Sequence, residues 1–360
     1  MFPSSMTASL SISAGNPILG LASSTTIRGN VTPLSCGVAM CTCNGKAFLE
    51  GQLRSLVEQT CVPDQIVVSD DMSDDGTWEQ LNSWAEVVRR RYKVRVTLLR
   101  NTKRLGVTRN FEQAIRAVDT DIIFLADQDD IWASNKVELL SARLESDPYM
   151  ALAHSDAFLI DDNDNDLGRS LFEALRLSAA ERMLVQQQRF FEVYCRRNLV
   201  TGTTVAFRRE LLDLALPFPG DWIHDEWLAA CAATIANVAM LPEKLTNYRQ
   251  HGTNAIGMPA TALSRIAFCA SRIAAMGRDD HLHYKVRRLQ AWKRRLIEAG
   301  ITAPEKVALL NEAQMHFNKR LKFRRGILAR LPPVFAEFKS RGYHRFGDGF
   351  VGIARDILNI

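Results

Sequence analysis

The sequence predicts an α/β fold with a mostly parallel, doubly wound sheet and a basic helical appendage at its carboxyl end. Short apolar runs alternate four times with segments whose apolar residues recur at helical spacing, which is the pattern of successive βα units. Polar clusters follow these runs where the predicted strands end. With 360 residues, the chain is long enough for a full α/β core and a second region.

The first βα unit begins at Cys36–Met40, whose apolar run predicts a buried strand. Thr42, Asn44 and Gly45 then form a turn signal. The helix that follows is predicted from its apolar spacing and has Pro63 beyond its end. Its apolar residues are Phe48, Leu49, Leu53, Leu56 and Val57.

The next units follow the same pattern. Strands are predicted at Gln65–Ser69 and Val94–Leu99, and helical spacing follows each of them. The helix-forming apolar residues are Trp78, Leu81, Ala85 and Val88 in the second unit, and Val107, Phe111, Ile115 and Val118 in the third.

The fourth strand, Ile122–Leu125, is an apolar run that ends in three carboxylates, Asp127, Asp129 and Asp130. Like charges this close repel, so each must stay hydrated or find a cation. Mg²⁺ or Mn²⁺, bridged to phosphate oxygens, is the usual cation for carboxylates at a strand end. The alternative is a solvated acidic turn.

These polar clusters all fall at the carboxyl ends of strands, where open α/β sheets bind ligands. The clusters are Asn44, the pair Asp70 and Asp71, and the pair Asp127 and Asp129. Neither G-x-G-x-x-G after the first strand nor G-x-x-x-x-G-K-[ST] is present. A nucleotide site without a glycine cradle needs a metal to neutralise the phosphates, which again favours a metal at Asp127 and Asp129.

Composition and charge narrow the class of protein, its location and its partners. Hydrophobic residues make up 47% and charged residues 24%, as in ordinary soluble proteins. Seven cysteines without repeating spacing indicate reduced thiols and a cytoplasmic location. Residues 261–360 hold 20 Lys and Arg against 8 Asp and Glu, a net charge of +12, whereas residues 1–260 carry −7. The two regions therefore meet different partners.

No segment reaches the roughly 20 apolar residues that a membrane span needs. The longest uncharged apolar stretch, Trp227–Leu241, predicts a buried helix that runs into a strand. Residues 1–33 are rich in Ser and Thr and lack the charge and apolar order of a secretory signal, so we expect a disordered leader.

Several runs together resemble the family 2 inverting glycosyltransferases, which have the Rossmann-like GT-A fold. They are VAMCTCNGKAFLEGQLRSLVEQT, IVVSDDMSDDGT, RLGVTRNFEQAI and FLADQDDIW. The later NLVTGTTVAFRREL, WIHDEWLAA and NYRQHGTNAIG are similar to the rhamnosyltransferase-like branch. The resemblance implies a glycosyltransferase domain at residues 34–257, with a nucleotide-binding half at 34–132 and an acceptor and catalytic half at 133–257. Residues 258–360 form the basic helical region.

The resemblance implies that Asp127 and Asp129 are the family's D-x-D motif, with Asp129 on the metal and Asp127 near the ribose and metal. It also implies that Asp70 and Asp71 read the base, with Thr42 and Asn44 in the same pocket. A carboxylate there favours a uracil or thymine base, whose N3–H is a donor. The Met72-Ser73 that follows departs from the family's usual Gly-Ser.

Arg104 and Asn110 stand before and within the third predicted helix, where a helix N-terminus and a guanidinium suit a phosphate or sugar. Solvation on the helix surface is the alternative for the neighbouring Arg109. Gly202, within Thr201–Thr203, is expected in the sugar or acceptor pocket, where glycine permits close approach.

Inverting transfer needs one general base for the acceptor hydroxyl. The resemblance gives this role to Asp225 in His224-Asp225-Glu226, and the alternative is that Asp225 only caps a helix. Glu226 is expected to face the sugar or a basic partner. The resemblance also implies that His251 reaches the metal or the diphosphate.

The basic region carries an apolar stripe of Val286, Leu289, Trp292 and Leu296 beside several Arg and Lys residues. Such a helix either packs on the catalytic domain or attracts it to an anionic membrane, and we expect both. Nucleic acid is not an expected partner, because no recognised nucleic-acid module is present.

The sequence thus predicts a cytoplasmic, inverting, Mg²⁺- or Mn²⁺-dependent glycosyltransferase, peripheral on the inner membrane face. The expected donor is a dTDP- or UDP-sugar, with rhamnose favoured by the branch that the chain resembles. The expected acceptor is a saccharide or lipid-linked glycan in surface polysaccharide synthesis. Two alternatives stay open: a catalytically inactive nucleotide-sugar binding or scaffold protein, and a phosphohydrolase that uses the clustered Asp residues on a metal.

Overall fold

The computed structural model of the chain describes residues 33–250, 277–323, 326–347 and 349–358. The predicted leader, apart from Pro33, and the predicted metal ligand His251 lie outside the described residues. From Pro33 to Ile360 the chain forms one compact unit.

The first half of the sheet is parallel, as the sequence predicts. β1 lies between β2 and β4, and β3 pairs with the outer side of β2. Every residue of β1, β2 and β4 is buried, as expected for strands that are covered on both faces. All four strands agree with the predicted bounds to within two residues. They are β1 (Cys36–Thr42), β2 (Gln65–Asp70), β3 (Arg95–Arg100) and β4 (Ile122–Ala126).

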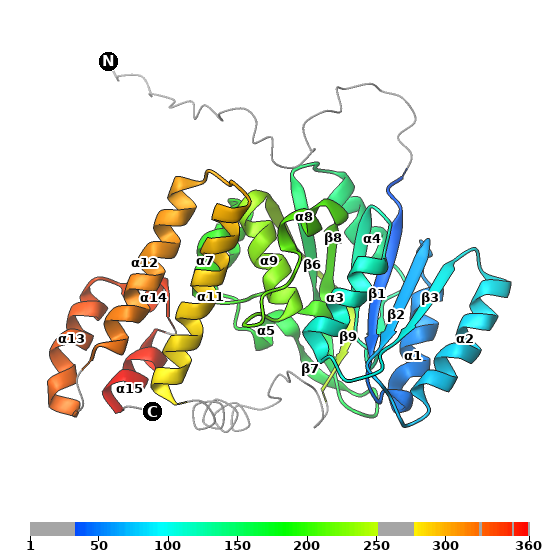
Figure 1. Cartoon of the computed structure of the whole chain (residues 1–360), viewed down its shortest axis with the longest axis horizontal. Coiled ribbons are helices and arrows are strands. Elements are labelled where there is room, and N and C mark those ends of the chain that lie inside the picture. The colour runs from blue at the N-terminus through cyan, green and yellow to red at the C-terminus, as the bar shows by residue number, and fades with distance from the viewer. Residues whose placement is uncertain (1–32, 251–276, 324–325, 348, 359–360) are drawn as a thin grey trace, which may run out of the picture. The chain divides into compact units, whose positions relative to one another are not determined.

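The second half of the sheet is mixed, which the prediction of a mostly parallel sheet did not anticipate. β8 runs antiparallel to both β4 and β6, whereas β9 is parallel to β6 and antiparallel to β5. β7 returns beside β6 as an antiparallel hairpin. The sheet order is β3-β2-β1-β4-β8-β6-β9-β5 (Figure 1). The added strands are β5 (Ile131–Trp132), β6 (Met150–Ile160), β7 (Asp166–Ser170), β8 (Val205–Arg208) and β9 (Asn237–Arg249).

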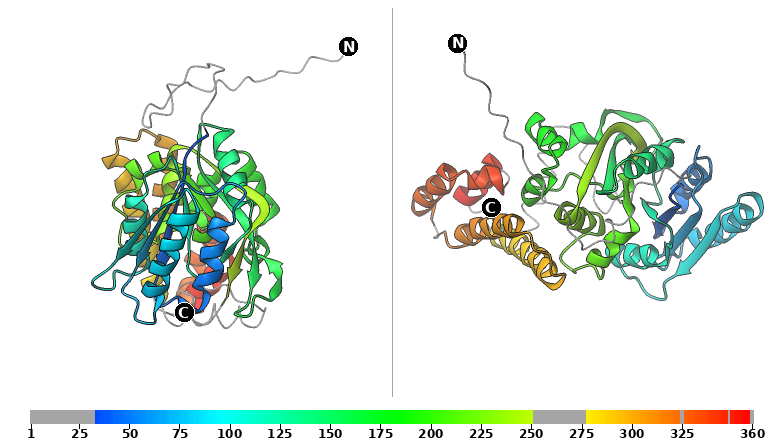
Figure 2. Two further views of the ribbon diagram at one scale, coloured as in Figure 1. Left: turned by 90° about the vertical axis from the view of Figure 1, so that its right-hand side faces the viewer. Right: turned by 90° about the horizontal axis from the view of Figure 1, so that it is seen from above.

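Helices cover both faces of the sheet and form one apolar core on each (Figure 2). On one face, α1 (Lys46–Val57), α2 (Thr77–Arg91) and α4 (Lys136–Glu145) pack together. On the other face lie α3 (Val107–Ala117), α7 (Phe190–Arg196) and α9 (His224–Ile235). The helix and strand predicted within Trp227–Leu241 are thereby found as α9 and β9. The short helices and 3₁₀ turns are α5 (Leu171–Ala174), α6 (Ala179–Gln186), α8 (Leu212–Ala215), η1 (Gly202–Thr204) and η2 (Arg209–Leu211).

The carboxyl-terminal region is helical, as its sequence pattern predicts. The predicted apolar stripe of α11 is buried in the same core as α7 and α9, which confirms the packing role. Trp292 from this stripe lies in contact with Trp222, which in turn contacts Trp227 of α9, with ring centroids 6.0 and 5.3 Å apart. The helices are α11 (Arg278–Glu298), α12 (Pro304–Leu321), α13 (Ile327–Lys339), α14 (Gly342–Arg345) and α15 (Phe350–Leu358).

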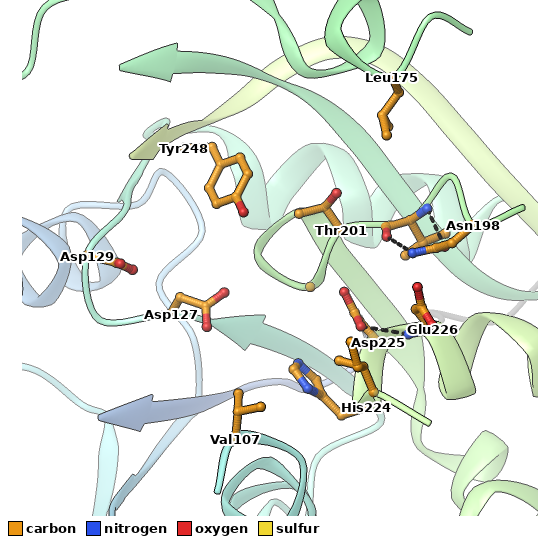
Figure 3. Close-up of a pocket in the computed structure, with 13 residues that line it drawn as sticks. Val107, Asp127, Asp129, Leu175, Asn198, Thr201, His224, Asp225, Glu226 and Tyr248 are labelled. Atoms are coloured by element: carbon orange, nitrogen blue, oxygen red, sulfur yellow. Dashed lines mark hydrogen bonds between the residues drawn. The ribbon is translucent and has the colours of Figure 1, made fainter. Parts of the chain in front are cut away.

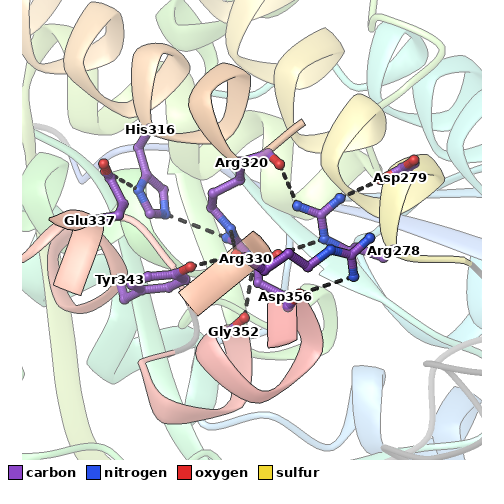
Figure 4. Close-up of polar contacts among 9 residues, drawn as sticks. All are labelled: Arg278, Asp279, His316, Arg320, Arg330, Glu337, Tyr343, Gly352 and Asp356. Atoms are coloured by element: carbon purple, nitrogen blue, oxygen red, sulfur yellow. Dashed lines mark hydrogen bonds and ion pairs between the residues drawn. The ribbon is translucent and has the colours of Figure 1, made fainter. Parts of the chain in front are cut away.

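One fully buried residue, Asp356 of α15, joins all five of these helices through its carboxylate and its backbone carbonyl (Figure 4). It accepts hydrogen bonds from Arg278 Nε of α11 and Arg320 Nε of α12, both at 2.7 Å, and from the Tyr343 hydroxyl of α14 at 2.6 Å. Arg330 of α13 donates to the Asp356 carbonyl at 3.1 Å. Buried charges of this kind are tolerated only when they are paired, so the network fixes the mutual arrangement of the helices.

No helix in the described part of the chain is long and apolar enough to cross a membrane. The six cysteines among the described residues are free thiols, as the sequence predicts.

Candidate active site

A pocket opens beyond the carboxyl end of β4, where the sequence places its polar clusters (Figure 3). It encloses about 190 Å³. The loop after β4, the segment leading into η1, the start of α9 and the end of β9 all contribute side chains. The lining residues are Val107, Asp127, Asp129, Leu175, Asn198, Val200, Thr201, Gly202, Ile223, His224, Asp225, Glu226 and Tyr248.

The loop that carries the Asp residues is fixed from behind by Arg249 at the end of β9. Its backbone N–H donates to Asp130 Oδ1 at 2.9 Å, and its Nε donates to the carbonyl of Asp129 at 2.7 Å. Asp130 is fully buried and holds this turn, whereas Asp127 and Asp129 face the pocket.

The pocket wall formed by Asp127 concentrates negative charge. Burial, followed by the charges of Asp130 and Asp129, raises the pKa of the Asp127 carboxyl well above its usual range. Burial and Asp129 likewise raise the pKa of Asp130 to about 7. A cation at this wall would relieve the repulsion.

Lys136, at the start of α4, is the buried cation behind this wall. Its Nζ donates to the Thr203 carbonyl and, at 2.9 Å, to Thr246 Oγ1, and it lies 3.8 Å from the centroid of the Trp132 ring. Burial lowers the pKa of Lys136, while Asp130 and Asp127 act in the opposite direction. No local sequence signal selects Lys136, because a lysine in the first turn of a helix is usually solvated.

Two carboxylates fit a hard divalent ion that is shared with a substrate. In the described ranges, no three His, Cys, Asp or Glu side chains are grouped so as to hold a metal by themselves. Mg²⁺ is commonly held by one or two carboxylates together with substrate phosphates and water. The donor set of Asp127 and Asp129, with its raised Asp127 pKa, matches that pattern.

Asp225 faces this wall from the first turn of α9 (Figure 3). The Glu226 N–H donates to Asp225 Oδ1 at 2.7 Å, and the Gly202 N–H also stabilises the carboxylate. Burial and then the Glu226 charge outweigh these bonds and raise the pKa of Asp225 to about 7. A carboxylate that titrates near neutral pH within a pocket is well suited to exchange a proton.

Gly202 permits the close approach that the sequence predicts for it. A Cβ at this position would lie 3.1 Å from His224 Nε2 and 3.4 Å from Asp225 Oδ2. His224 is stacked on Phe111 with centroids 3.8 Å apart, and burial lowers its pKa to about 3. His224 is therefore neutral at physiological pH and cannot serve as a cation here.

Glu226 has the basic partner that was one of its two predicted roles. Arg288, from α11, forms an ion pair with the Glu226 carboxylate. The Arg288 guanidinium lies 3.8 Å from the centroid of the Trp222 ring. The backbone carbonyl of Arg288 accepts a hydrogen bond from Trp222 Nε1 at 3.2 Å. A side chain from the basic region thus reaches the edge of the pocket, which no local sequence signal could show.

The predicted base-reading pair, Asp70 and Asp71, is hydrogen-bonded within the protein. Asp71 accepts from the Leu105 and Gly106 N–H groups at 2.7 and 2.9 Å, and Asp70 accepts from Thr42 Oγ1 at 2.8 Å. Both carboxylates are buried, and neither lines the pocket. They hold the loops beside them, and their contact with the base stays a prediction.

The remaining predicted nucleotide contacts also lie outside the pocket. Asn110 is buried, donating to the Ser69 carbonyl at 2.9 Å and accepting from Ser69 Oγ at 2.7 Å, so it positions α3 against β2. Asn44 accepts from the Asp74 N–H at 3.0 Å, and Arg104 contacts Cys43 Sγ. A nucleotide contact remains a prediction for Thr42, Asn44, Arg104 and Asn110.

The structure therefore brings together five of the predicted residues: Asp127, Asp129, Gly202, Asp225 and Glu226. One wall offers two carboxylates that can hold a metal ion, which in turn can bind an anionic group of a substrate. The other wall offers a single carboxylate that can accept a proton. Such an arrangement suits an attack by a hydroxyl group with departure of a phosphate-linked leaving group.

Comparisons with known proteins point the same way. The sequence model of the family described as glycosyl transferase family 2 matches residues 37–214. The dTDP-rhamnosyl transferase RfbG of Shigella flexneri is 27% identical over 231 residues, which cover 61% of this chain and 73% of RfbG. The abequosyltransferase RfbV of Salmonella typhimurium is 31% identical over 107 residues, covering 29% of this chain and 31% of RfbV.

Among solved structures, TarS of S. aureus is similar in fold. Its complex with UDP-GlcNAc has a TM-score of 0.54 and 17% identity, and its complex with UDP has a TM-score of 0.52 and 16% identity. In both cases the match covers 91% of this chain and 89% of the TarS chain.

Proposed function

The chain belongs to glycosyl transferase family 2 and has the GT-A fold, and from this premise we propose that it transfers a sugar with inversion from a dTDP- or UDP-sugar. The proposed acceptor is a saccharide or lipid-linked glycan in surface polysaccharide synthesis. Rhamnose is the favoured sugar, because RfbG is a dTDP-rhamnosyl transferase. The observation that carries the proposal is Asp225, a buried carboxylate of raised pKa, facing Asp127 across one pocket.

In this proposal Asp225 is the general base. It accepts the proton of the acceptor hydroxyl while that oxygen bonds to the anomeric carbon and the bond from the sugar to the diphosphate breaks. The Glu226 and Gly202 N–H groups hold the carboxylate in place, and the ion pair with Arg288 fixes Glu226 beside it. A single base is sufficient for inversion, in contrast to the two carboxylates of most glycoside hydrolases.

Asp127 and Asp129 would hold Mg²⁺ or Mn²⁺, with His251 as the third predicted ligand. When bound, the ion neutralises charge on the departing nucleoside diphosphate. Arg249 keeps the two carboxylates at the pocket by fixing their loop.

We expect metal-dependent stabilisation by the donor nucleotide. A thermal-shift panel of UDP-, dTDP-, GDP- and CMP-sugars, each with Mn²⁺ and with chelator, should show a shift for dTDP- or UDP-sugars with metal. A ligand at 100 times its Kd adds about 2.7 kcal/mol to the free energy of unfolding. Asp129→Ala should lose this shift, because one of the two proposed metal ligands is removed.

The panel also decides between the proposal and its alternatives. If no nucleotide gave a metal-dependent shift, the assignment of Asp127 and Asp129 to a metal would be wrong. Donor binding without sugar transfer would favour an inactive binding protein, and release of phosphate from monoesters would favour a phosphohydrolase.

The pH dependence of kcat/KM tests the base directly. Asp225 acts only when it is deprotonated, and its pKa is raised to about 7. We therefore expect kcat/KM to fall about tenfold per pH unit below pH 7 and to level off above it. Glu226→Gln should move this limb to lower pH, because it removes the charge that helps to raise the Asp225 pKa. A limb that stays near pH 4, where ordinary Asp side chains titrate, would argue against Asp225 as the base.

A further inference from the structure

Exposed apolar side chains are concentrated at the carboxyl-terminal end of the described chain. Of 17 large hydrophobic side chains that are exposed among the described residues, eight lie between Ile327 and Leu358. Scattered exposed hydrophobics are normal, but a local concentration marks an interaction surface. The eight are Ile327, Leu328, Leu331, Phe335 and Phe338 on α13, and Phe350, Val351 and Leu358 on α15.

On α13 these side chains form one face. Their spacing of one, three or four residues places all five within about 100° of the helix circumference. The buried face is formed by Arg330, Val334 and Glu337 instead. An ordinary surface helix buries its apolar stripe and exposes its charges, so α13 presents the opposite arrangement.

The apolar surface continues from α13 to α15. The Phe338 ring lies 6.4 Å from the Phe350 ring, and the His344 ring of α14 lies 5.8 Å from Phe338 and 5.5 Å from Phe350. We call the eight hydrophobic residues of α13 and α15 the apolar face. In Figures 1 and 2, α13 and α15 lie at the end of the molecule away from β3 and α2.

The exposed charged side chains of the segment that carries the apolar face are basic. Within the described residues from 326 to 358 they are Lys339, Arg341 and Arg345, of which Arg345 pairs with Glu312 of α12 at 2.8 Å. Glu337 is buried 3.6 Å from Lys319, and Asp356 is buried in its ion pairs with Arg278 and Arg320. Lys339 Nζ lies only 5.8 Å from the centroid of the Phe335 ring. The surface therefore combines exposed apolar side chains with basic side chains that attract anions.

We propose that α13 and α15 dock the protein on an anionic lipid bilayer, with the apolar face at the boundary between headgroups and acyl chains. Helices with an exposed apolar face and basic flanks bind membranes in this way, and each Lys or Arg near an anionic surface adds to the attraction. With 13 and 9 residues, the two helices are too short to span the bilayer.

Two other interpretations of this region agree less well with the structure. The stripe of α11, from which the sequence predicts membrane attraction, is buried in the core and is not available. A second copy docked through the same face would bring the exposed Lys339 and Arg341 of both copies close together, which like charges oppose. An anionic lipid bilayer can take up the apolar side chains of this face and attract its basic side chains.

The test is co-flotation of the full chain with vesicles of phosphatidylcholine alone or with phosphatidylglycerol. We expect binding to the anionic vesicles that weakens as salt rises. The triple variant Leu328→Ser, Phe335→Ser, Phe350→Ser should lower vesicle affinity by roughly tenfold or more, because these side chains are 82%, 60% and 72% exposed in the free protein and would lose their burial in lipid.

A matched control changes three other exposed hydrophobic side chains, which lie on the catalytic domain. Val87→Ser, Tyr149→Ser and Met183→Ser, at 56%, 62% and 57% exposure, should leave vesicle binding unchanged. Equal vesicle binding by both triple variants would overturn the proposal. So would absence of vesicle binding together with a concentration-dependent dimer that only the first triple abolishes, since the face would then belong to a second copy.

The proposal is independent of the proposed function. All six positions lie outside the pocket, so the metal-dependent donor shift should be retained in both triple variants. If the wild type and both variants showed no donor shift, the transferase proposal would fail. The vesicle measurements would still decide the membrane proposal.

Discussion

Asp225→Asn should lower kcat by roughly 10²–10⁴-fold while the Kd for the donor stays unchanged. The amide has nearly the shape of the carboxylate but cannot accept the hydroxyl proton. The Asp225 carboxylate receives N–H bonds from Glu226 and Gly202, and an amide oxygen can keep one of them, so the start of α9 should stay in place. The measurement is single-turnover sugar transfer at saturating donor, with donor affinity measured by thermal shift.

The matched control for this variant is Asp221→Asn, three residues before α9. Asp221 is 40% exposed, pairs with Arg287 at 3.1 Å and does not line the pocket, so its loss should change kcat less than twofold. Asp129→Ala provides the opposite control, because it should lose metal-dependent donor binding. Equal loss of donor binding in the Asp225 and Asp129 variants would remove Asp225 from the role of base.

Asp356→Asn should lower the free energy of unfolding by roughly 3–5 kcal/mol. The change keeps the size of the side chain but removes the Asp356 charge from two buried guanidinium groups, so that Arg320 loses this counter-charge and Arg278 keeps only the exposed Asp279. These groups bridge α11, α12 and α15, so the loss should be seen as a lower midpoint in urea unfolding followed by far-UV circular dichroism.

Asp279→Asn is the control for this stability prediction, since Asp279 pairs with the same Arg278 at 2.5 Å. Its side chain is 67% exposed, whereas that of Asp356 is fully buried. We expect a cost below about 1 kcal/mol for the exposed pair. Similar small costs for both variants would show that the buried network does not hold the helices together.

The sequence could predict the parallel half of the sheet because its signals are local. Each of the first four strands is a short apolar run followed by helical spacing, so length and period identify it. The mixed half was missed for a physical reason. β8 is only four residues long, and β6 owes its place to pairing with β8 and β9, partners that are distant in sequence. Local patterns contain no information on such register.

The residues of the candidate site also divide into those that a local pattern identifies and those that only the tertiary fold brings in. Asp127, Asp129 and Asp225 are polar residues at the ends of apolar elements, and their pattern was sufficient to select them. Lys136 and Arg288 were not selected, because a charged residue within a helix is normally solvated and only the tertiary fold buries it. For Asp70 and Asp71 a contact with the base stays a prediction, and the structure adds that loop N–H groups donate to Asp71, which no local pattern indicates.

The contact of Trp222, Trp227 and Trp292 has an optical consequence. Half of the six tryptophans in the chain lie at the junction of the segment before α9, α9 itself and α11. The fluorescence of the cluster is sensitive to the separation of these segments, whereas Trp78, Trp84 and Trp132 report on the other apolar core, which α1, α2 and α4 cover. Because Trp222 also stacks on the Arg288 that pairs with Glu226, the intrinsic emission of the protein should respond to events at the pocket without any added label.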